Sequence, residues 1–130
     1  MITPIISVII TNYNFQKYIA RSIRSLINQS IDSKDYEIIV IDDHSSDNSI
    51  GVINNYLSNI KFIVNKKNIG LSASLNLGIK SSKGKYIIRV DGDDYVHTDF
   101  LKILFSHLEL NPDLDSVYCD YQEVDENEHI

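Results

Sequence analysis

Aspartate side chains gather at two points of this sequence, each directly after an apolar run. Asp42 and Asp43 follow the run 36–41, and the string Asp91-Gly92-Asp93-Asp94 follows the run 86–90. Carboxylates that lie close together repel one another and raise one another's pKa unless a positive charge lies among them. If the fold brings the two groups together, the simplest chemistry they can perform is to hold a divalent cation.

The ligand types narrow the choice of that cation. Carboxylate oxygens without a cysteine pair or a histidine cluster favour a hard ion such as Mg²⁺ or Mn²⁺ over Zn²⁺. Each motif alone also has an ordinary structural interpretation, because Gly and Asp form turns and because Asp and Ser cap helices. Their joint occurrence at the ends of two strands favours a site over two unrelated turns.

Apolar periodicity predicts strands that alternate with helices. Nearly continuous β-branched runs are typical of strands buried on both faces. We expect strands over 5–11, 36–41, 61–65, 86–90 and 116–121, and helices over 15–29, 50–57, 71–81 and 100–108. This alternation predicts an α/β fold with a Rossmann-like, doubly wound, mostly parallel sheet. The polar segments 11–14, 42–47, 65–70 and 91–94 would then meet at one edge, where ligands bind in such folds.

Four smaller expectations accompany these elements. Ser46 or Asp47 is expected to cap the second helix. Asn76 and Gly78 are expected to allow close packing of the third helix. Cys119 is expected to be a buried strand thiol. The segment 123–130 is expected to be an irregular acidic tail, so that a single α/β domain spans 1–122.

Composition excludes several classes of protein. The net charge is −6, from 12 Lys and Arg against 18 Asp and Glu, which opposes binding to nucleic acid. No apolar run approaches the roughly 20 residues of a membrane span. The single cysteine cannot form an internal disulfide, so we expect a reducing, cytoplasmic setting, with the cytoplasmic face of a membrane as the other candidate location of a longer parent protein.

Four blocks of the sequence, in this order, resemble the N-terminal half of family 2 glycosyltransferases. They are SVIITNYN (7–14), IVIDDHSSD (39–47), NIGLSASLNLG (68–78) and DGDD (91–94). The resemblance covers about residues 5–121, and four matched blocks are far more specific than any one of them. It implies the GT-A fold, a nucleotide-sugar donor, a glycan or glycoconjugate acceptor, and Mn²⁺ or Mg²⁺ held by a D-x-D motif.

Carried over by position, the resemblance implies six nucleotide-binding residues: Thr11, Tyr13, Asp42, Asn68, Gly70 and Asp91. The Tyr13 ring would pack against base or ribose, Asp42 would accept a hydrogen bond from a uracil ring nitrogen, and Asp91 would approach the ribose. Asp93 would coordinate the metal, with Asp91 as a second candidate ligand. For Asn68 and Gly70 the stronger interpretation is a turn that uses Asn and Gly for left-handed backbone angles, which explains them without any ligand.

The implied function is donor binding in a metal-dependent transferase that uses a UDP-linked sugar, in polysaccharide or glycoconjugate synthesis. No residue here matches the catalytic base of the family, so we expect this chain alone to be inactive in transfer. Two alternatives stay open. One is a noncatalytic nucleotide-binding module. The other is a receiver-like Mg²⁺-binding domain, although that fold requires acidic residues after its first strand, where this chain has Thr11 and Asn12. A dinucleotide oxidoreductase is disfavoured, because the first strand-to-helix turn lacks G-x-G-x-x-G.

Overall fold

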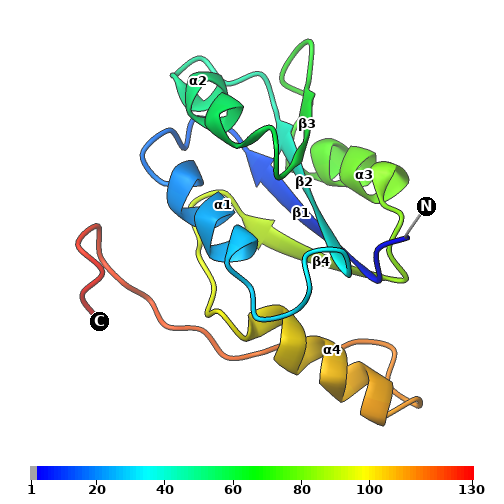
Figure 1. The fold of residues 1–130 in the computed structure, drawn as a ribbon. Coiled ribbons are helices and arrows are strands. Elements are labelled where there is room, and N and C mark those ends of the chain that lie inside the picture. Colours follow the sequence, from blue (N-terminus) through cyan, green and yellow to red (C-terminus); the bar gives the residue numbers. More distant parts are fainter. Residues whose placement is uncertain (1–2) are drawn as a thin grey trace.

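A computed structural model describes residues 3–130, so the first two residues of the predicted domain 1–122 lie outside the described part. Strands and helices alternate along the chain (Figure 1). The strands are β1 (Ile6–Asn12), β2 (Tyr36–Asp42), β3 (Lys61–Val64) and β4 (Tyr86–Asp91). The helices are α1 (Ile19–Ile27), α2 (Ser49–Ile53) with the 3₁₀ turn η1 (Asn54–Tyr56), α3 (Leu71–Ser81) and α4 (Phe100–Leu110).

The four strands form one parallel sheet in the order β3-β2-β1-β4. Helices cover both of its faces. Side chains of α3 pack on Ile9, Ile39 and Ile41 on one face. On the other face α1, α2 and α4 enclose the larger core. The predicted doubly wound, parallel α/β architecture is therefore confirmed.

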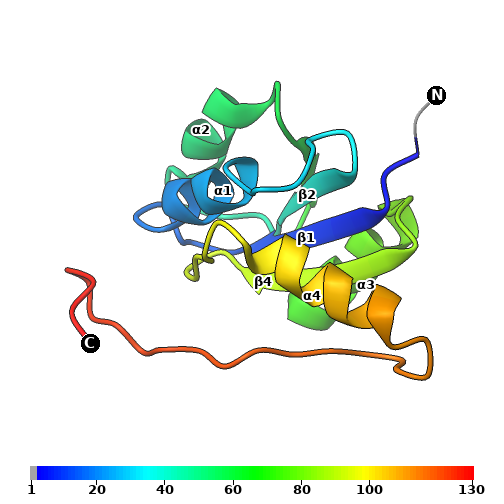
Figure 2. The ribbon, with the colours of Figure 1, turned by 60° about the horizontal axis from the view of Figure 1, so that its bottom comes forward.

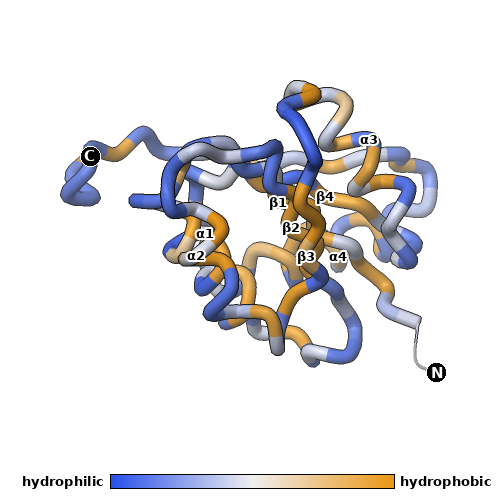
Figure 3. Tube along the Cα trace, turned by 90° about the horizontal axis from the view of Figure 1, so that it is seen from above, coloured by the Kyte–Doolittle hydropathy of each residue, from blue (hydrophilic) through white to orange (hydrophobic). Residues whose placement is uncertain are grey.

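The two central strands form the core of the protein. All seven residues of β1 are buried, as are six of the seven residues of β2. This burial explains their continuous apolar pattern. In Figure 3 the tube is mostly orange where the labels of the four strands gather. Gly78 lets α3 approach the sheet closely, since a Cβ there would lie 2.5 Å from Ile9 Cγ2. Asn76 is exposed and does not share that role, because two helical positions turn the chain to the opposite side.

The start of α1 differs from the prediction, and the structure distinguishes the two residues expected at the start of α2. α1 begins at Ile19 rather than at Phe15, and residues 15–18 form a turn in which the Tyr18 and Ile19 amides donate to the Phe15 carbonyl. The Gln16 amide at the start of this turn donates to the Asp47 carboxylate. At α2, Asp47 rather than Ser46 meets the helix start, since Asp47 Oδ1 accepts a hydrogen bond of 2.9 Å from the Ser49 amide.

The prediction of a fifth strand over 116–121 is wrong. This segment has no regular structure, and the side chains of Tyr118 and Tyr121 are 91% and 83% exposed. A strand needs a neighbour for its backbone hydrogen bonds, and among residues 3–130 β4 pairs only with β1. Cys119 is correspondingly exposed rather than buried. Figure 2 shows the chain leaving α4 as an extended line that runs back past the helices.

The acidic segment at the end of the chain has local order. Its residues 125–129 close a turn in which the Asp125 amide donates to the His129 carbonyl. Two contacts tie it to α1 and the residue before it: Tyr18 Oη donates to Glu126, and Arg21 pairs with Glu128 at 3.2 Å. No helix within residues 3–130 is long and apolar enough to cross a bilayer.

Candidate functional site

The register of the sheet brings the predicted site residues to one edge. Thr11 of β1 lies beside Ile41 of β2 and Asp91 of β4. In the next row, Asn12 lies beside Asp42, and Asp42 beside Val64. The strands thus end within one residue of each other, as expected for a parallel sheet. The four polar segments therefore leave the sheet along a single edge.

The first two segments are locked together by side chain to backbone hydrogen bonds. Asn14, in the left-handed conformation at φ 59°, accepts a hydrogen bond of 2.8 Å from the Ser46 amide through Oδ1. Ser45 Oγ accepts from the Asn14 amide at 2.9 Å, and Gln16 Oε1 accepts from the Asn48 amide at 2.7 Å. This role of Asn14 and Gln16 was not predicted from the sequence. The only available signal was the enrichment of Asn at turn positions with positive φ.

Asp42 is fully buried at the end of β2, and its carboxylate is occupied by protein donors. Oδ1 accepts from the Ser45 amide at 2.8 Å, and Oδ2 accepts from Ser45 Oγ at 2.6 Å and from Asn12 Nδ2 at 2.7 Å. In this arrangement Asp42 shapes the turn that follows β2. Direct contact with a base would require Ser45 to move.

Asp43 joins the second segment to the third. It is 4% exposed, and it accepts hydrogen bonds from Asn65 Nδ2 at 2.8 Å, from the Ile69 amide at 2.9 Å and from the Gly70 amide at 2.8 Å. Burial alone would raise the pKa of Asp43, but these hydrogen bonds outweigh it and hold the pKa below its ordinary value. Asp43, which the sequence grouped with Asp42 as a carboxylate that could help to hold a cation, instead fixes the loop that leads into α3.

The remaining nucleotide-site candidates differ in accessibility. Thr11 is 6% exposed, so a ligand could contact only a small part of its surface. Tyr13 is 46% exposed, and Asn68 is also exposed. Gly70 has φ 87°, which strains any residue with a Cβ, and the space beside it is open. These positions leave the Tyr13 ring and the 68–70 backbone accessible at the edge of the sheet.

The fourth polar segment, residues 91–94, carries three carboxylates. Arg89 makes a bidentate ion pair with Asp91, with nitrogen to oxygen distances of 2.7 and 2.8 Å. Asp93 and Asp94 are exposed. Desolvation raises the pKa of Asp94, and the charges of Asp93 and Asp91 raise it further, against the opposite effect of Arg21 and Arg89. The loop therefore carries uncompensated negative charge that a cation would relieve.

Within residues 3–130, no three His, Cys, Asp or Glu side chains converge on one point as a complete metal cage. This arrangement still suits Mg²⁺ or Mn²⁺, because such ions are commonly held by one or two carboxylates and complete their shell with water and substrate phosphates. The exposed Asp93 and the raised pKa of Asp94 fit such an open site.

A groove of about 1210 Å³ opens beside this acidic loop. Its walls come from the loop itself, from the start of α1, from α4 and from the end of the chain, and include Tyr18, Arg21, Asp93, Tyr95, Tyr121 and Glu126. Exposed aromatic rings and carboxylates share this surface. Both groups are suited to contacts with hydroxylated ligands.

Comparison with known proteins decides the family. The family described as "Glycosyl transferase family 2" matches residues 7–130. The chain belongs to glycosyl transferase family 2. The resemblance of the four blocks is thereby confirmed, and the receiver-like alternative is wrong. The GT-A fold is likewise confirmed by the solved structures that this chain resembles.

Two staphylococcal relatives illustrate the similarity. Poly(ribitol-phosphate) β-N-acetylglucosaminyltransferase TarP of Staphylococcus aureus is 41% identical over 113 residues, which are 84% of this chain and 35% of TarP. The crystal structure of S. aureus TarS 1–349 matches with a TM-score of 0.77 at 29% identity, over 82% of this chain and 33% of that one. TarS has also been solved in complex with UDP-GlcNAc. The chain thus spans about a third of the length of these proteins.

A more distant structure shares the fold alone. It is the mannosyltransferase PcManGT of Pyrobaculum calidifontis, solved with GDP-Man and Mn²⁺. It matches with a TM-score of 0.76 at 19% identity, over 82% of this chain and 32% of that one.

Proposed function

We propose that this chain is the donor-binding part of a glycosyltransferase that takes a sugar from a UDP-linked donor. The observation that carries the proposal is the shared edge of the sheet. There the ends of β1 and β2 meet the acidic loop after β4, in a chain of glycosyl transferase family 2. The UDP-GlcNAc complex of TarS supports the choice of uridine. Transfer to a glycan or glycoconjugate hydroxyl, in polysaccharide or glycoconjugate synthesis, is the proposed activity of the whole protein.

We assign the proposed donor-binding residues to two groups, one that contacts the nucleoside and one that lies near the diphosphate. Thr11, Tyr13, Asn68 and Gly70 would border the nucleoside, with the accessible Tyr13 ring packing on the base. Asp42 would reach a base only if Ser45 releases it. Otherwise it acts by holding the turn on which the base rests. Asp91 would lie near the ribose, and Asp93 near the diphosphate.

A divalent cation, bound by Asp93 with Asp91 as second candidate, would neutralise the charge of the departing diphosphate. The protein's own part is to place these carboxylates against the donor. Arg89, bound to Asp91 at 2.7 Å, restrains that side chain. A reducing, cytoplasmic location remains part of the proposal, on the ground of the single free cysteine.

The first test is nucleotide preference. In calorimetric titration with Mn²⁺, the chain should bind UDP at least tenfold more tightly than ADP, because the related TarS is solved with a uridine-linked donor. Tyr13→Ala should weaken UDP binding about tenfold, the effect of losing one base stack of about 1–3 kcal/mol. The assay must reach millimolar affinity, about −4 kcal/mol.

The matched control is Tyr118→Ala, which removes a tyrosine that is 91% exposed on the segment after α4. Its UDP affinity should equal that of the wild type. Equal affinity of the wild type for UDP and ADP would contradict the uracil pocket, and absence of binding to either would contradict donor binding altogether.

A further inference from the structure

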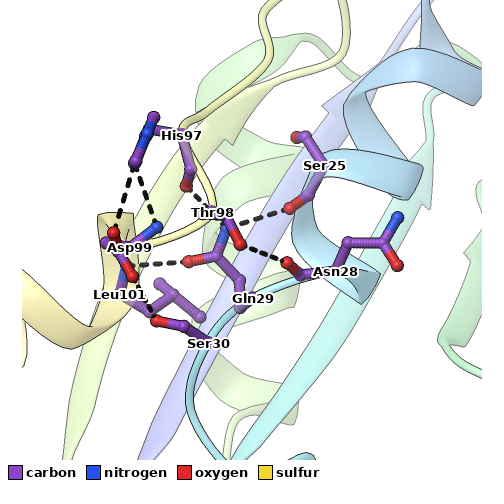
Figure 4. A network of polar contacts seen from close by, with 8 residues as sticks. All are labelled: Ser25, Asn28, Gln29, Ser30, His97, Thr98, Asp99 and Leu101. Carbon is purple, nitrogen blue, oxygen red and sulfur yellow. Dashed lines mark hydrogen bonds and ion pairs between the residues drawn. The ribbon is translucent and has the colours of Figure 1, made fainter.

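Gln29 connects the end of α1 to the segment that follows the acidic loop. The side chain is 9% exposed and lies between the two (Figure 4). Its Nε2 donates to the carbonyls of Ser25 and His97, both at 2.9 Å, and its Oε1 accepts from the amide of Leu101 at 2.9 Å. One buried amide thus holds two backbone groups of the 97–101 segment on α1.

Neighbouring contacts extend this attachment. The Ser30 amide donates to the Thr98 carbonyl at 2.9 Å, and Thr98 Oγ1 donates to the Asn28 carbonyl at 2.8 Å. Ser25 Oγ accepts from the Val96 amide at 3.2 Å. Together with Gln29 these bonds fix residues 96–101 along the end of α1, as the dashed lines of Figure 4 show in part.

Closer to the start of α1, longer contacts reach the acidic loop itself. Ser22 Oγ donates to the Asp91 carbonyl at 3.3 Å, and an Arg21 guanidinium nitrogen lies 3.4 Å from the Asp93 carbonyl. The Arg21 guanidinium also lies over the Tyr95 ring, 4.2 Å from its centre. Residues 91–101 therefore follow α1, with their strongest hydrogen bonds at the Gln29 end.

We propose that Gln29 is a positioning residue for the D-x-D loop, an inference that rests on the proposed function. β4 fixes the loop at Asp91, where its pairing with β1 ends. Between there and Val96 the loop carries exposed carboxylates, whose mutual repulsion favours opening rather than one geometry. The attachment at Gln29 supplies the second fixed end, so that Asp93 keeps its place relative to β1 and β2. Without it, the buried Leu101 amide would also lose its acceptor.

The test replaces Gln29 by methionine, which has similar length and none of the three hydrogen bonds. The matched control is Tyr36→Phe. The Tyr36 hydroxyl bonds the Leu26 carbonyl at 2.8 Å, at the same end of α1, and none of its hydrogen bonds reaches residues 91–101. Ser25→Ala is a milder second variant that removes only the contact to Val96 and one within α1.

Three quantities separate positioning from general destabilisation. They are the free energy of unfolding, amide exchange of residues 96–101, and Mn²⁺ binding read from paramagnetic broadening of the amides of residues 91–95. Gln29→Met should speed exchange at least tenfold and weaken both Mn²⁺ binding and Mn²⁺-dependent UDP binding at least tenfold. Ser25→Ala should show a smaller change in the same direction. Tyr36→Phe should keep wild-type affinity.

Wild-type Mn²⁺ affinity in Gln29→Met, or an equal loss of affinity in an equally destabilised Tyr36→Phe, would overturn the positioning role. The Mn²⁺ measurement needs no nucleotide. A wild type that binds Mn²⁺ at residues 91–95 but not UDP therefore rejects the proposed function and leaves Gln29 to be judged on Mn²⁺ alone. A wild type that binds neither rejects both.

Discussion

Replacing Asp93 by alanine should abolish the dependence of UDP binding on a divalent cation. We expect wild-type affinity to fall at least tenfold when Mn²⁺ is replaced by chelator, a change of about 1.4 kcal/mol, because the diphosphate then meets an acidic loop directly. In Asp93→Ala the affinities with Mn²⁺ and with chelator should coincide. Calorimetric titration of both proteins under both conditions measures the effect.

The control for this change is Asp115→Ala, which removes the same charge from an exposed position after α4. It should keep the full cation dependence. Cation dependence that persists undiminished in Asp93→Ala would reject Asp93 as a ligand.

The same substitution should not destabilise the cation-free protein. The charge of Asp93 is one of the causes that raise the pKa of Asp94, after desolvation. A carboxyl whose pKa is raised by folding costs stability above that pKa, and the cost disappears as the pH falls through it. Asp93→Ala should therefore lessen the stabilising contribution that protonation of Asp94 makes on mild acidification of the cation-free protein.

The sheet edge could be predicted because its determinants are local in the sequence. The β-branched runs of β1 and β2 have no polar face, and this specifies parallel strands buried on both sides. Once the strands are parallel, their carboxyl ends must lie at the same edge of the sheet. Asp42 and Asp91, the last residues of β2 and β4, are therefore placed at that edge. The D-G-D-D turn could likewise be predicted, because Gly and Asp are residues that form turns.

The partners of each side chain could not be predicted in this way. Asp42 and Asp43 are adjacent and chemically identical, yet their partners differ. Asp42 accepts a hydrogen bond from the amide of Ser45 in the turn that follows it. Asp43 accepts from the amides of Ile69 and Gly70, which lie 26 and 27 residues further along the chain. From the sequence, Gln29 is simply the last polar residue of a predicted helix. Its three hydrogen bonds are made with residues 25, 97 and 101, and two of these partners are distant in the sequence. Such contacts are set by tertiary packing, which periodicity does not encode.

The fifth strand failed for a related reason. Residues 116–121 contain Val117 and two tyrosines, residue types that are common in strands, but residue type alone does not supply a neighbouring strand. Pairing requires a neighbouring edge, and the segment lies apart from β4 in this chain. Its exposed Tyr118 and Tyr121 are the consequence.

Asp43→Ala should produce the largest loss of stability among these substitutions. It removes a buried carboxylate that accepts hydrogen bonds from Asn65, Ile69 and Gly70. The Ile69 and Gly70 amides then lose their acceptor, whereas Asn65 Nδ2 keeps Ser74 Oγ. Hydrogen bonds to charged groups and unsatisfied buried donors are each worth roughly 1–3 kcal/mol, so we expect a loss of about 3 kcal/mol at pH 7. Urea unfolding measures it, with Asp115→Ala as the exposed control.

The pH dependence of this loss identifies its origin. Because the pKa of Asp43 is lower in the folded protein than in the unfolded chain, its contribution is present above the unfolded pKa and disappears as the pH falls through the folded one. The difference between wild type and Asp43→Ala should therefore be constant near neutrality and shrink below about pH 4. Amide exchange at Ile69 and Gly70 should be faster in the variant at neutral pH. A stability difference independent of pH, with unchanged exchange at those two amides, would mean that Asp43 is merely packed and that another group holds the loop before α3.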